Sequence, residues 1–221
     1  MLKNDYRVYE ESVRREMLPF VPENAKTILD VGCSVGNFGE MLKVERGAEV
    51  WGIEPDQEAA FLAARRLDNV LCGHFDPNLD LANKRFDCIV FNDVLEHMVD
   101  PYSALEYAKS LLVPKGVVVA SIPNVRYFMN VWNLLVYRAW DYVDTGILDR
   151  THLRFFTRDS IVRTFVKHGF RIQSITGINS LAMCNPSMRL KFSVLNLVTL
   201  NRSSDMKWMQ FAVVATPEGG E

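Results

Sequence analysis

Residues 27–38 read TILDVGCSVGNF and join a short apolar run to a glycine-rich turn and the start of a helix. The apolar run of residues 27–31 predicts a buried strand that Gly32 closes. A helix is expected to begin at Asn37. In a doubly wound sheet, ligands bind at this carboxyl end of the strand. Gly32 and Gly36 would let the backbone pass close to a ligand, although a tight turn without a ligand has the same composition.

Four more apolar runs follow, and segments with helical spacing separate them. The expected strands are residues 50–53, 69–72, 86–91 and 117–122. One of the intervening helices is predicted to begin at Asp100-Pro101, with Asp100 as the N-cap and Pro101 in the first turn. Short apolar strands that alternate with helices are typical of a parallel sheet covered on both faces.

The end of the chain adds two further strands, residues 170–175 and 208–215, which are expected to pair as an antiparallel hairpin. A helix over residues 159–167, opened by Thr157 and stopped by Gly169, precedes them. The predicted fold class is therefore α/β: a Rossmann-like, doubly wound, mostly parallel seven-stranded sheet with an antiparallel C-terminal hairpin and a helical cap.

Composition narrows the class of protein without indicating its chemistry. The 221 residues are 48% hydrophobic and 24% charged, with a formal net charge of −2, so no global basic field for nucleic acid is present. The sequence contains no run of eighteen apolar residues, so no transmembrane segment is expected. The first residues, MLKNDYRVYEE, do not resemble a signal peptide. The four dispersed cysteines favour reduced thiols and a cytoplasmic location.

Glu54 is the second residue that points to a ligand. It ends the strand next to the glycine turn, where a carboxylate can accept two hydrogen bonds from a ribose diol. The spacing of Gly32, Ser34 and Gly36 does not match GxGxxG, and Asp30 adds a negative charge where a diphosphate would lie. These residues favour a cofactor that has a ribose and no phosphate, with cationic or zwitterionic ends.

Four segments in this order resemble the class I S-adenosylmethionine-dependent methyltransferases. They are Leu29–Phe38, Glu54, FDCIVFNDVLEH at Phe86–His97 and LLVPKGVVVASIPN at Leu111–Asn124. The resemblance covers roughly Tyr6 to Phe170. This chain has Ser34 where the family usually has glycine and Lys115 where it has the first glycine of PGG. Neither difference is expected to abolish binding.

The resemblance implies S-adenosylmethionine as cofactor and S-adenosylhomocysteine as product. The turn at Gly32 would pass beneath the methionine part, Glu54 would take the ribose hydroxyls, and Asn92 would lie near the methionine amino group. Pro55 would pack near the adenine, and the loop after the third strand would meet the adenine edge. The cofactor-binding residues expected in this way are Asp30, Gly32, Cys33, Ser34, Gly36, Glu54, Pro55, Phe75, Asp76 and Asn92.

Methyl transfer to oxygen often uses a general base, and histidine is the usual one near neutral pH. His152, in the segment DRTHLRFFT of residues 149–157, is the candidate catalytic residue, with a hydrogen-bonded loop anchor as the alternative. Similar segments occur in relatives from sugar- and polysaccharide-modifying pathways. His74 has no catalytic argument, and His168, beside Gly169 at a helix end, is expected to be structural.

Asp93, Glu96 and His97 resemble the metal-associated motif of quinone-pathway O-methyltransferases. A helix that begins near Asp93 would place all three on one side. The favoured interpretation is a wall of the cofactor site, as in metal-free relatives, so no metal is expected, and a metal site at these three residues is the weaker alternative.

Residues 128–140 show an i, i+3, i+4 apolar pattern and predict one amphipathic helix. It is interpreted as a lid on the sheet edge, with a homodimer face or a lipid-facing surface as alternatives. A second helix at residues 188–200 could join this cap, and an N-terminal helix is expected over residues 5–18. One domain is expected, divided into an N-terminal helical segment (1–26), a cofactor-binding core (27–124), a cap insertion (125–157) and a C-terminal helix with edge strands (158–221).

The predicted function is methyl transfer from S-adenosylmethionine to a small-molecule, glycan or lipid-linked acceptor, on oxygen, with the cap over the acceptor site. No nucleic-acid partner is expected. Two alternatives stay open from the sequence. One is a nicotinamide-dependent oxidoreductase, which the absent GxGxxG disfavours, and the other is a non-catalytic binding module built on the cofactor fold.

Overall fold

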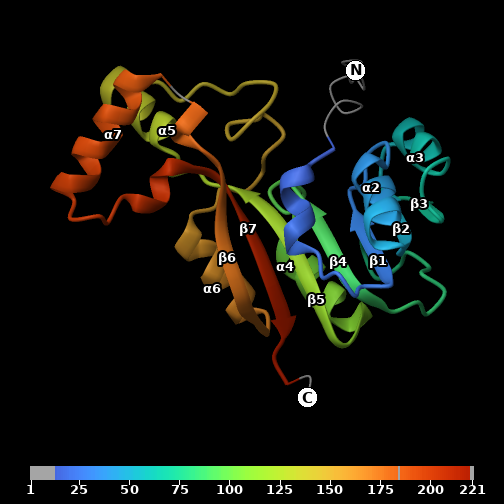
Figure 1. The fold of residues 1–221 in the computed structure, drawn as a ribbon. Helices are drawn as coiled ribbons and strands as arrows, with labels where there is room; N and C mark the ends of the chain where they lie inside the picture. The colour runs from blue at the N-terminus through green and yellow to red at the C-terminus, as the bar shows by residue number, and fades with distance from the viewer. Residues whose placement is uncertain (1–12, 184, 220–221) are drawn as a thin grey trace.

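Five parallel strands form most of a seven-stranded sheet (Figure 1). They are β1 (Thr27–Val31), β2 (Glu49–Glu54), β3 (Asn69–Cys72), β4 (Phe86–Asn92) and β5 (Leu112–Pro123). β6 (Phe170–Ser180) and β7 (Trp208–Pro217) are antiparallel, and β7 lies between β5 and β6. The order β3-β2-β1-β4-β5-β7-β6 confirms the expected fold class. This computed structural model describes residues 13–183 and 185–219.

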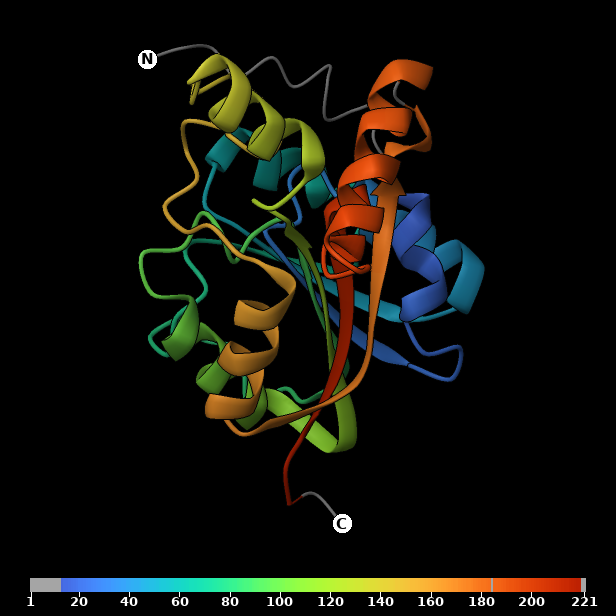
Figure 2. The same cartoon turned by 90° about the vertical axis from the view of Figure 1, so that its left-hand side faces the viewer.

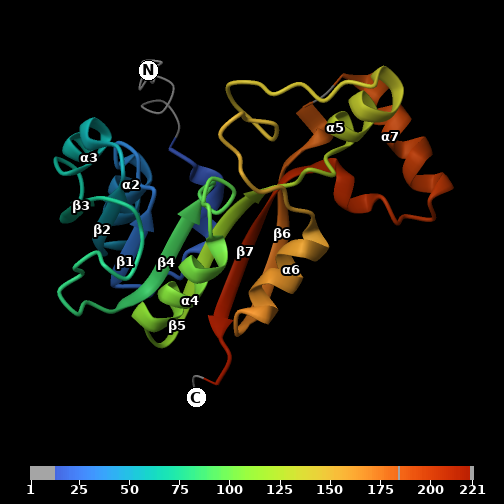
Figure 3. The ribbon, with the colours of Figure 1, turned by 180° about the vertical axis from the view of Figure 1, so that it is seen from behind.

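Both faces of the central strands β1 and β4 are buried, which explains why these strands show no polar alternation. Along β4, Ile89 and Phe91 join one apolar core, while Cys88 and Val90 join the core on the opposite face. The helices on the first face are α4 (Pro101–Leu111) and α6 (Arg158–Lys167), seen in front of the sheet in Figure 3. The other face is covered by η1 (Arg15–Phe20), α2 (Asn37–Arg46) and α3 (Gln57–Ala63).

Side-chain caps place the starts of α4 and α6. The Asp100 carboxylate accepts hydrogen bonds from the backbone N–H groups of Tyr102 and Ser103, both at 3.1 Å, and Pro101 begins α4. Thr157 and Ser160 form a reciprocal capping box at the start of α6. Both predicted helix starts are thereby confirmed to within one residue.

The cap has a small apolar core of its own, in which α5 (Phe128–Trp132) packs against α7 (Pro186–Val198). The rings of Phe128 and Phe192 are 5.6 Å apart between centroids. Figure 2 shows both helices at the end of the sheet where β7 begins. In Figure 1 they lie on the far side of the molecule from α2 and α3, beside β6 and β7 rather than over β1. The second cap helix expected from the sequence is therefore present.

The prediction of one continuous helix over residues 128–140 is wrong. After α5 the chain forms a π-helical turn, η2 (Asn133–Tyr137), and then ends the helix at Arg138, which has φ +56°. A π turn rotates the following side chains off the face that the preceding turn buried. Leu135 is consequently 74% exposed although the apolar pattern assigned it to the packed face.

The N-terminal helix predicted over residues 5–18 lies mostly outside the described residues. The part that is described is the 3₁₀ helix η1, which continues through Pro19 to Phe20 instead of ending before the proline. Its anchor is Met17, which is fully buried against the α2 face of the sheet. Among the described residues, no helix has the length and apolar character needed to cross a membrane.

Candidate active site

The turn between β1 and α2 is held against the end of β2. The backbone N–H groups of Gly32 and Cys33 both donate to the Ile53 carbonyl, at 2.8 and 3.1 Å. Gly32 has φ +68°, and a Cβ there would lie 2.6 Å from Cγ2 of Val94 in the loop after β4. Glycine is therefore required, and the turn is packed directly on the β4 loop. β1 and β4 flank the point where the strand order reverses, which is the ligand-binding position in doubly wound sheets.

The Glu54 carboxylate is fixed at the end of β2 by two backbone donors. Ser34 N–H donates to Oε2 and Asp56 N–H donates to Oε1, each at 2.9 Å. Each oxygen keeps a second acceptor position, so the pair remains able to receive two hydroxyl groups. Burial raises the pKa of Glu54, and the two backbone hydrogen bonds oppose that rise. This geometry fits a ribose diol.

Two of the other predicted cofactor contacts, Cys33 and Phe75, do not present their side chains to the turn. The Cys33 sulfur is buried and points towards Gly52, so only the backbone of Cys33 lies at the turn. The ring of Phe75 is 5.6 Å from that of Phe91 and 4.9 Å from that of Tyr107, between centroids. Phe75 is therefore a core residue, because its ring fills space beside β4.

Other expected contacts remain available around the turn. Pro55 is exposed just after β2, and Gly36, with φ +85°, caps the start of α2. Asp76 is half-buried and its Oδ1 accepts a hydrogen bond from Asn78 N–H at 2.7 Å. At the end of β4, both polar side-chain atoms of Asn92 are buried and have no hydrogen-bond partner in the described structure. An unpaired buried amide is costly, so Asn92 fits a polar ligand group.

Asp93 does not join Glu96 and His97, and the helix expected to begin near it is absent from the described structure. The residue has φ +54°, and turns replace the helix over residues 93–97. Its carboxylate accepts hydrogen bonds from Ser121 Oγ at 2.9 Å and Gln210 Nε2 at 2.8 Å, and it forms an ion pair with Arg14. Arg14 of the N-terminal segment therefore binds the Asp93 carboxylate, which the motif assigned to a metal.

His152 takes the place beside Glu96 and His97 that Asp93 does not fill. One potential ligand atom from each of the three lies within 4.8 Å of the others. His152 is buried, with its Nδ1 2.9 Å from the Ile147 carbonyl and its Nε2 3.9 Å from Glu96 Oε1. The backbone carbonyl of Glu96 accepts from the N–H groups of Leu153 and Arg154, at 2.8 and 3.0 Å. The loop of residues 149–157 is thus hydrogen-bonded to the β4 loop.

Glu96 is the most unusual member of this cluster. It is 1% exposed, and neither of its carboxylate oxygens has a hydrogen-bond partner among the described residues. Burial, and secondly the charge of Asp93, raise its pKa well above the usual range for a glutamate. A protonated carboxyl group, or a bound cation, satisfies such a site.

His97 ends a chain of hydrogen bonds that begins at a carboxylate. Thr151 Oγ1 donates to Asp149 Oδ1 at 2.7 Å and lies 3.0 Å from Nδ1 of His97. Because the hydroxyl proton goes to Asp149, Nδ1 of His97 is the donor in the second contact, and Nε2 carries the lone pair. Burial of part of the ring, and secondly His152, lower the pKa of His97, which favours the neutral base. The N–H of His97 also donates to Val94, the residue that packs on Gly32, at 3.0 Å.

A family model described as a methyltransferase domain matches residues 1–175, most of the chain. The protein belongs to this methyltransferase family. A ubiquinone biosynthesis O-methyltransferase of Psychrobacter arcticus is 32% identical over 165 residues, which are 70% of this chain and 62% of that protein. Another, from Haemophilus ducreyi, is 33% identical over 109 residues, which are 45% of this chain and 46% of that protein. The matches thus span about half to three-fifths of these curated relatives.

Solved structures agree with this methyltransferase in fold. An S-adenosylmethionine-dependent methyltransferase of Archaeoglobus fulgidus has a TM-score of 0.63 at 19% identity and covers 96% of this chain and 99% of its own. A Thermotoga maritima protein described as a possible histamine N-methyltransferase also has a TM-score of 0.63, at 18% identity. The match covers 96% of this chain and 91% of the Thermotoga maritima chain. The class I methyltransferase fold predicted from the motifs is confirmed.

The methyltransferase site contains residues that sequence patterns did not indicate. Arg14 and Gln210 are 79 and 117 positions from Asp93, which both contact. Thr151 stands directly before the predicted His152, yet its partner His97 is 54 positions away. A run of Asp, Arg, Thr and His in one loop was the available signal, and it does not identify which side chains meet.

Asp30 gives this methyltransferase a testable pH dependence. Burial, and secondly the charge of Glu54, raise the pKa of Asp30 to about 7. The folded state then binds a proton that the unfolded state releases near pH 4, so stability falls as pH rises from about 4 to about 7. We expect urea unfolding of the cofactor-free protein to lose about 4 kcal/mol over this range through Asp30, a loss that Asp30→Asn removes.

The control for this experiment is Glu58→Gln, because Glu58 is exposed on α3. Its unfolding free energy should follow the wild-type pH dependence. Parallel curves for wild type and Asp30→Asn would show that Asp30 is ionised in the folded protein at all these pH values.

Proposed function

We propose that this methyltransferase transfers the methyl group of S-adenosylmethionine to an oxygen atom of a small-molecule acceptor. The observation that carries the proposal is the Asp149–Thr151–His97 chain of hydrogen bonds, which ends at His97 in the β4 loop that packs on the glycine turn. The relatives named ubiquinone biosynthesis O-methyltransferase support oxygen as the acceptor atom. Glycan and lipid-linked hydroxyl compounds belong among the acceptors to be tested.

In the proposed reaction, Glu54 holds the ribose hydroxyls and the Gly32 turn passes beneath the methionine part. Asn92 supplies hydrogen bonds to the polar end of the cofactor. The acceptor oxygen attacks the sulfonium methyl in line, so that the new O–CH₃ bond forms as the S–CH₃ bond breaks. His97 Nε2 takes the acceptor's proton, and Asp149, acting through Thr151, stabilises the imidazolium that results.

We assign the base to His97 and a positioning role to His152. The sequence favoured His152, but its Nδ1 is held by the Ile147 carbonyl and its Nε2 faces buried Glu96. The two imidazole rings meet edge to face, with 4.6 Å between centroids. His152 therefore orients His97 and anchors the loop that carries Thr151.

A second role for the same cluster is favoured by the unpaired oxygens of Glu96. Glu96, His97 and His152 together have the ligand types that Zn²⁺ accepts, and Glu96 lacks any other partner in the described structure. A divalent ion there would lower the pKa of an acceptor hydroxyl bound to it. If the cluster holds Zn²⁺, calorimetry will show binding that Glu96→Gln and His152→Ala lose and Asp93→Asn keeps. If Asp93→Asn lost Zn²⁺ binding as Glu96→Gln and His152→Ala do, Asp93 would have to be counted among the metal ligands.

The proposed function is tested by incubating the protein with cofactor carrying an isotopically labelled methyl group and a panel of catechols, phenols, sugars and lipid-linked hydroxyl compounds. We expect label in one chemical class, on oxygen by NMR of the product. Methylation of nitrogen or carbon would contradict the proposed acceptor atom. Tight cofactor binding with no transfer across the panel would instead favour the non-catalytic binding module.

A further inference from the structure

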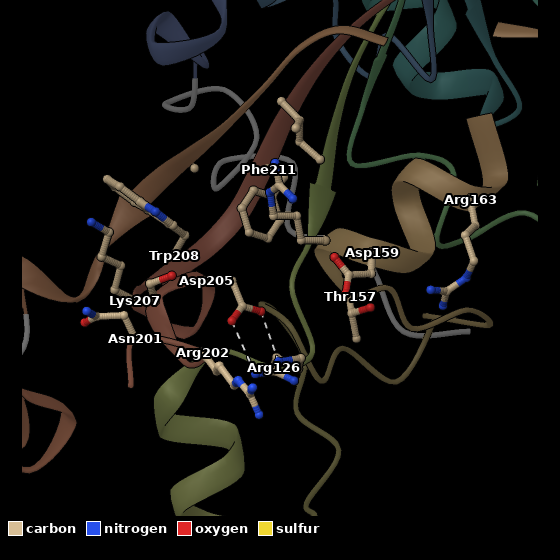
Figure 4. A pocket seen from close by; sticks show the side chains of 14 residues that line it. Arg126, Thr157, Asp159, Arg163, Asn201, Arg202, Asp205, Lys207, Trp208 and Phe211 are labelled. Carbon is tan, nitrogen blue, oxygen red and sulfur yellow. Dashed lines mark hydrogen bonds and ion pairs between the residues drawn. The ribbon is translucent and has the colours of Figure 1, made fainter. Parts of the chain in front are cut away.

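A basic groove lies on the face of β7 opposite the Asp93–Gln210 contact. It has a volume of about 540 Å³ and is bounded by the start of α6, by β6 and β7, and by η4 (Ser204–Lys207). Successive residues of a strand face opposite sides of the sheet. Phe211 lines the groove, so its neighbour Gln210, which contacts Asp93, faces the other side. Figure 4 shows Asp159 and Arg163 of α6 across the groove from Lys207 and Trp208. The groove is therefore separate from the candidate active site.

The walls of this groove carry an excess of positive charge. Five of the lining residues are cationic and two are carboxylates. The cations are Arg126, Arg158, Arg163, Arg202 and Lys207. Asp205 is already paired with Arg126, at 3.0 Å between Oδ2 and Nε, as the dashed lines of Figure 4 indicate. Within residues 13–183 and 185–219, no carboxylate lies within ion-pair distance of the other four cations.

The sequence around the groove is also segregated by charge. Residues 160–204, which include Arg163 and Arg202 of the groove, contain six lysines and arginines and no aspartate or glutamate, whereas Asp159 and Asp205 of the groove stand directly outside this stretch. The positive end of α6, a ten-residue helix, adds to the same field. Positive charges in excess of the groove's carboxylates repel one another, so an anion bound in the groove would relieve that repulsion.

Packing and hydrogen bonds hold the floor of the groove in a fixed position. Trp208 lies against Gly177, where a Cβ would stand only 2.1 Å from the indole Cγ, so a residue with a side chain would displace the ring. Asn124 Nδ2 donates to the backbone carbonyls of Asp205 and Trp208, at 3.1 and 3.0 Å, which fixes η4 to the end of β5. The indole ring, Phe211 and Ile175 provide an apolar surface beneath the cations.

We infer that this groove binds a ligand bearing a diphosphate group. Arginine side chains match phosphate oxygens with paired hydrogen bonds, and four cations without carboxylate partners suit two adjacent phosphoryl groups better than one. The volume lies within the range of small-molecule sites, which leaves room for an organic portion beside Phe211 and Ile175. The inference stands on the groove and does not depend on the acceptor proposed above.

Inorganic pyrophosphate is the probe for this site. We expect calorimetric titration to show binding that weakens about tenfold or more in the double variant Arg158→Ala/Arg202→Ala. Arg171→Ala is the matched control, because Arg171 is exposed on β6 outside the groove and its loss should leave affinity unchanged. If Arg171→Ala weakened pyrophosphate binding as much as the double variant does, the effect would come from general surface charge and the proposed site would be wrong. Sulfate binding as tightly as pyrophosphate would overturn the diphosphate assignment.

A measurement on the wild-type protein keeps the test independent of variant folding. The chain has four tryptophans, and Trp208 is the one that lines the groove. With fluorinated tryptophan, pyrophosphate should shift the Trp208 resonance and leave those of Trp51, Trp132 and Trp140 in place. No shift of Trp208 at millimolar pyrophosphate would refute the inference. Repeating the titration with a nucleoside diphosphate and with an alkyl diphosphate distinguishes the source of the diphosphate group.

Discussion

Glu54→Gln should abolish tight cofactor binding. The wild-type carboxylate accepts from Ser34 N–H and Asp56 N–H and offers its remaining acceptor positions to the ribose hydroxyls. In the glutamine variant, one end of the side chain becomes an NH₂ group that faces a backbone donor, so a backbone contact and a ribose contact are lost together. Each hydrogen bond to a charged group contributes about 1.5–3 kcal/mol, so affinity for S-adenosylhomocysteine should fall about 100-fold or more.

The measurement is calorimetric titration with S-adenosylhomocysteine, accompanied by thermal unfolding of each variant. Glu58→Gln is the matched control, because it makes the same chemical change at an exposed position four residues away. Its affinity should equal that of wild type. A folded Glu54→Gln protein that binds within threefold of wild type would remove Glu54 from the cofactor site. NAD titrated into wild type should show no binding, since the turn has no GxGxxG spacing.

The ends of the strands were predictable because both faces of the sheet are buried. A central strand without polar alternation is visible as an apolar run, so the predicted bounds of β1 equal the observed ones and those of β4 differ by one residue. Glu54 followed directly, since strand ends of a parallel sheet meet at one edge, and Asn92, which the family resemblance assigned to the cofactor, ends β4 at that edge. The capping residues Asp100 and Thr157 were equally local, because a cap and the N–H groups that it satisfies lie within three positions of each other.

Contacts between loops were not predictable in the same way. Asp93 looked like a partner of Glu96 through helical spacing, yet Arg14, Ser121 and Gln210 surround it instead. No periodicity relates these four positions, because the fold alone brings them together. The prediction of the cap helix was wrong for a different reason. The apolar pattern of residues 128–140 is helical, but a π turn shifts its phase after Trp132.

Turnover should depend more on His97 than on any other histidine. Removing a general base lowers a rate by about 10²–10⁴, so His97→Ala should lose turnover by that factor with the acceptor found in the screen. Cofactor affinity should stay unchanged, because the His97 ring contacts Thr151 and His152 and leaves the Glu54 contacts intact. The assay is single-turnover transfer of labelled methyl, with titration of S-adenosylhomocysteine as the binding control.

The neighbouring variants separate a base from a positioning residue. Thr151→Val removes the hydroxyl that links His97 to Asp149 and should lower turnover less than His97→Ala does. His152→Ala should also keep cofactor affinity and reduce turnover, and unchanged turnover would remove it from catalysis. His168→Ala is the negative control, because His168 contacts Glu106 and Tyr102 at the far end of α6.

Imidazole in solution provides the decisive readout for His97. A small base can enter the space left in His97→Ala and accept the acceptor's proton, so transfer should increase with imidazole concentration in that variant and not in wild type. A residue that only shaped the loop would not be rescued in this way, because imidazole restores a lone pair without restoring the hydrogen bonds to Thr151. Rescue of His152→Ala with no rescue of His97→Ala would exchange the two assignments and make His152 the base.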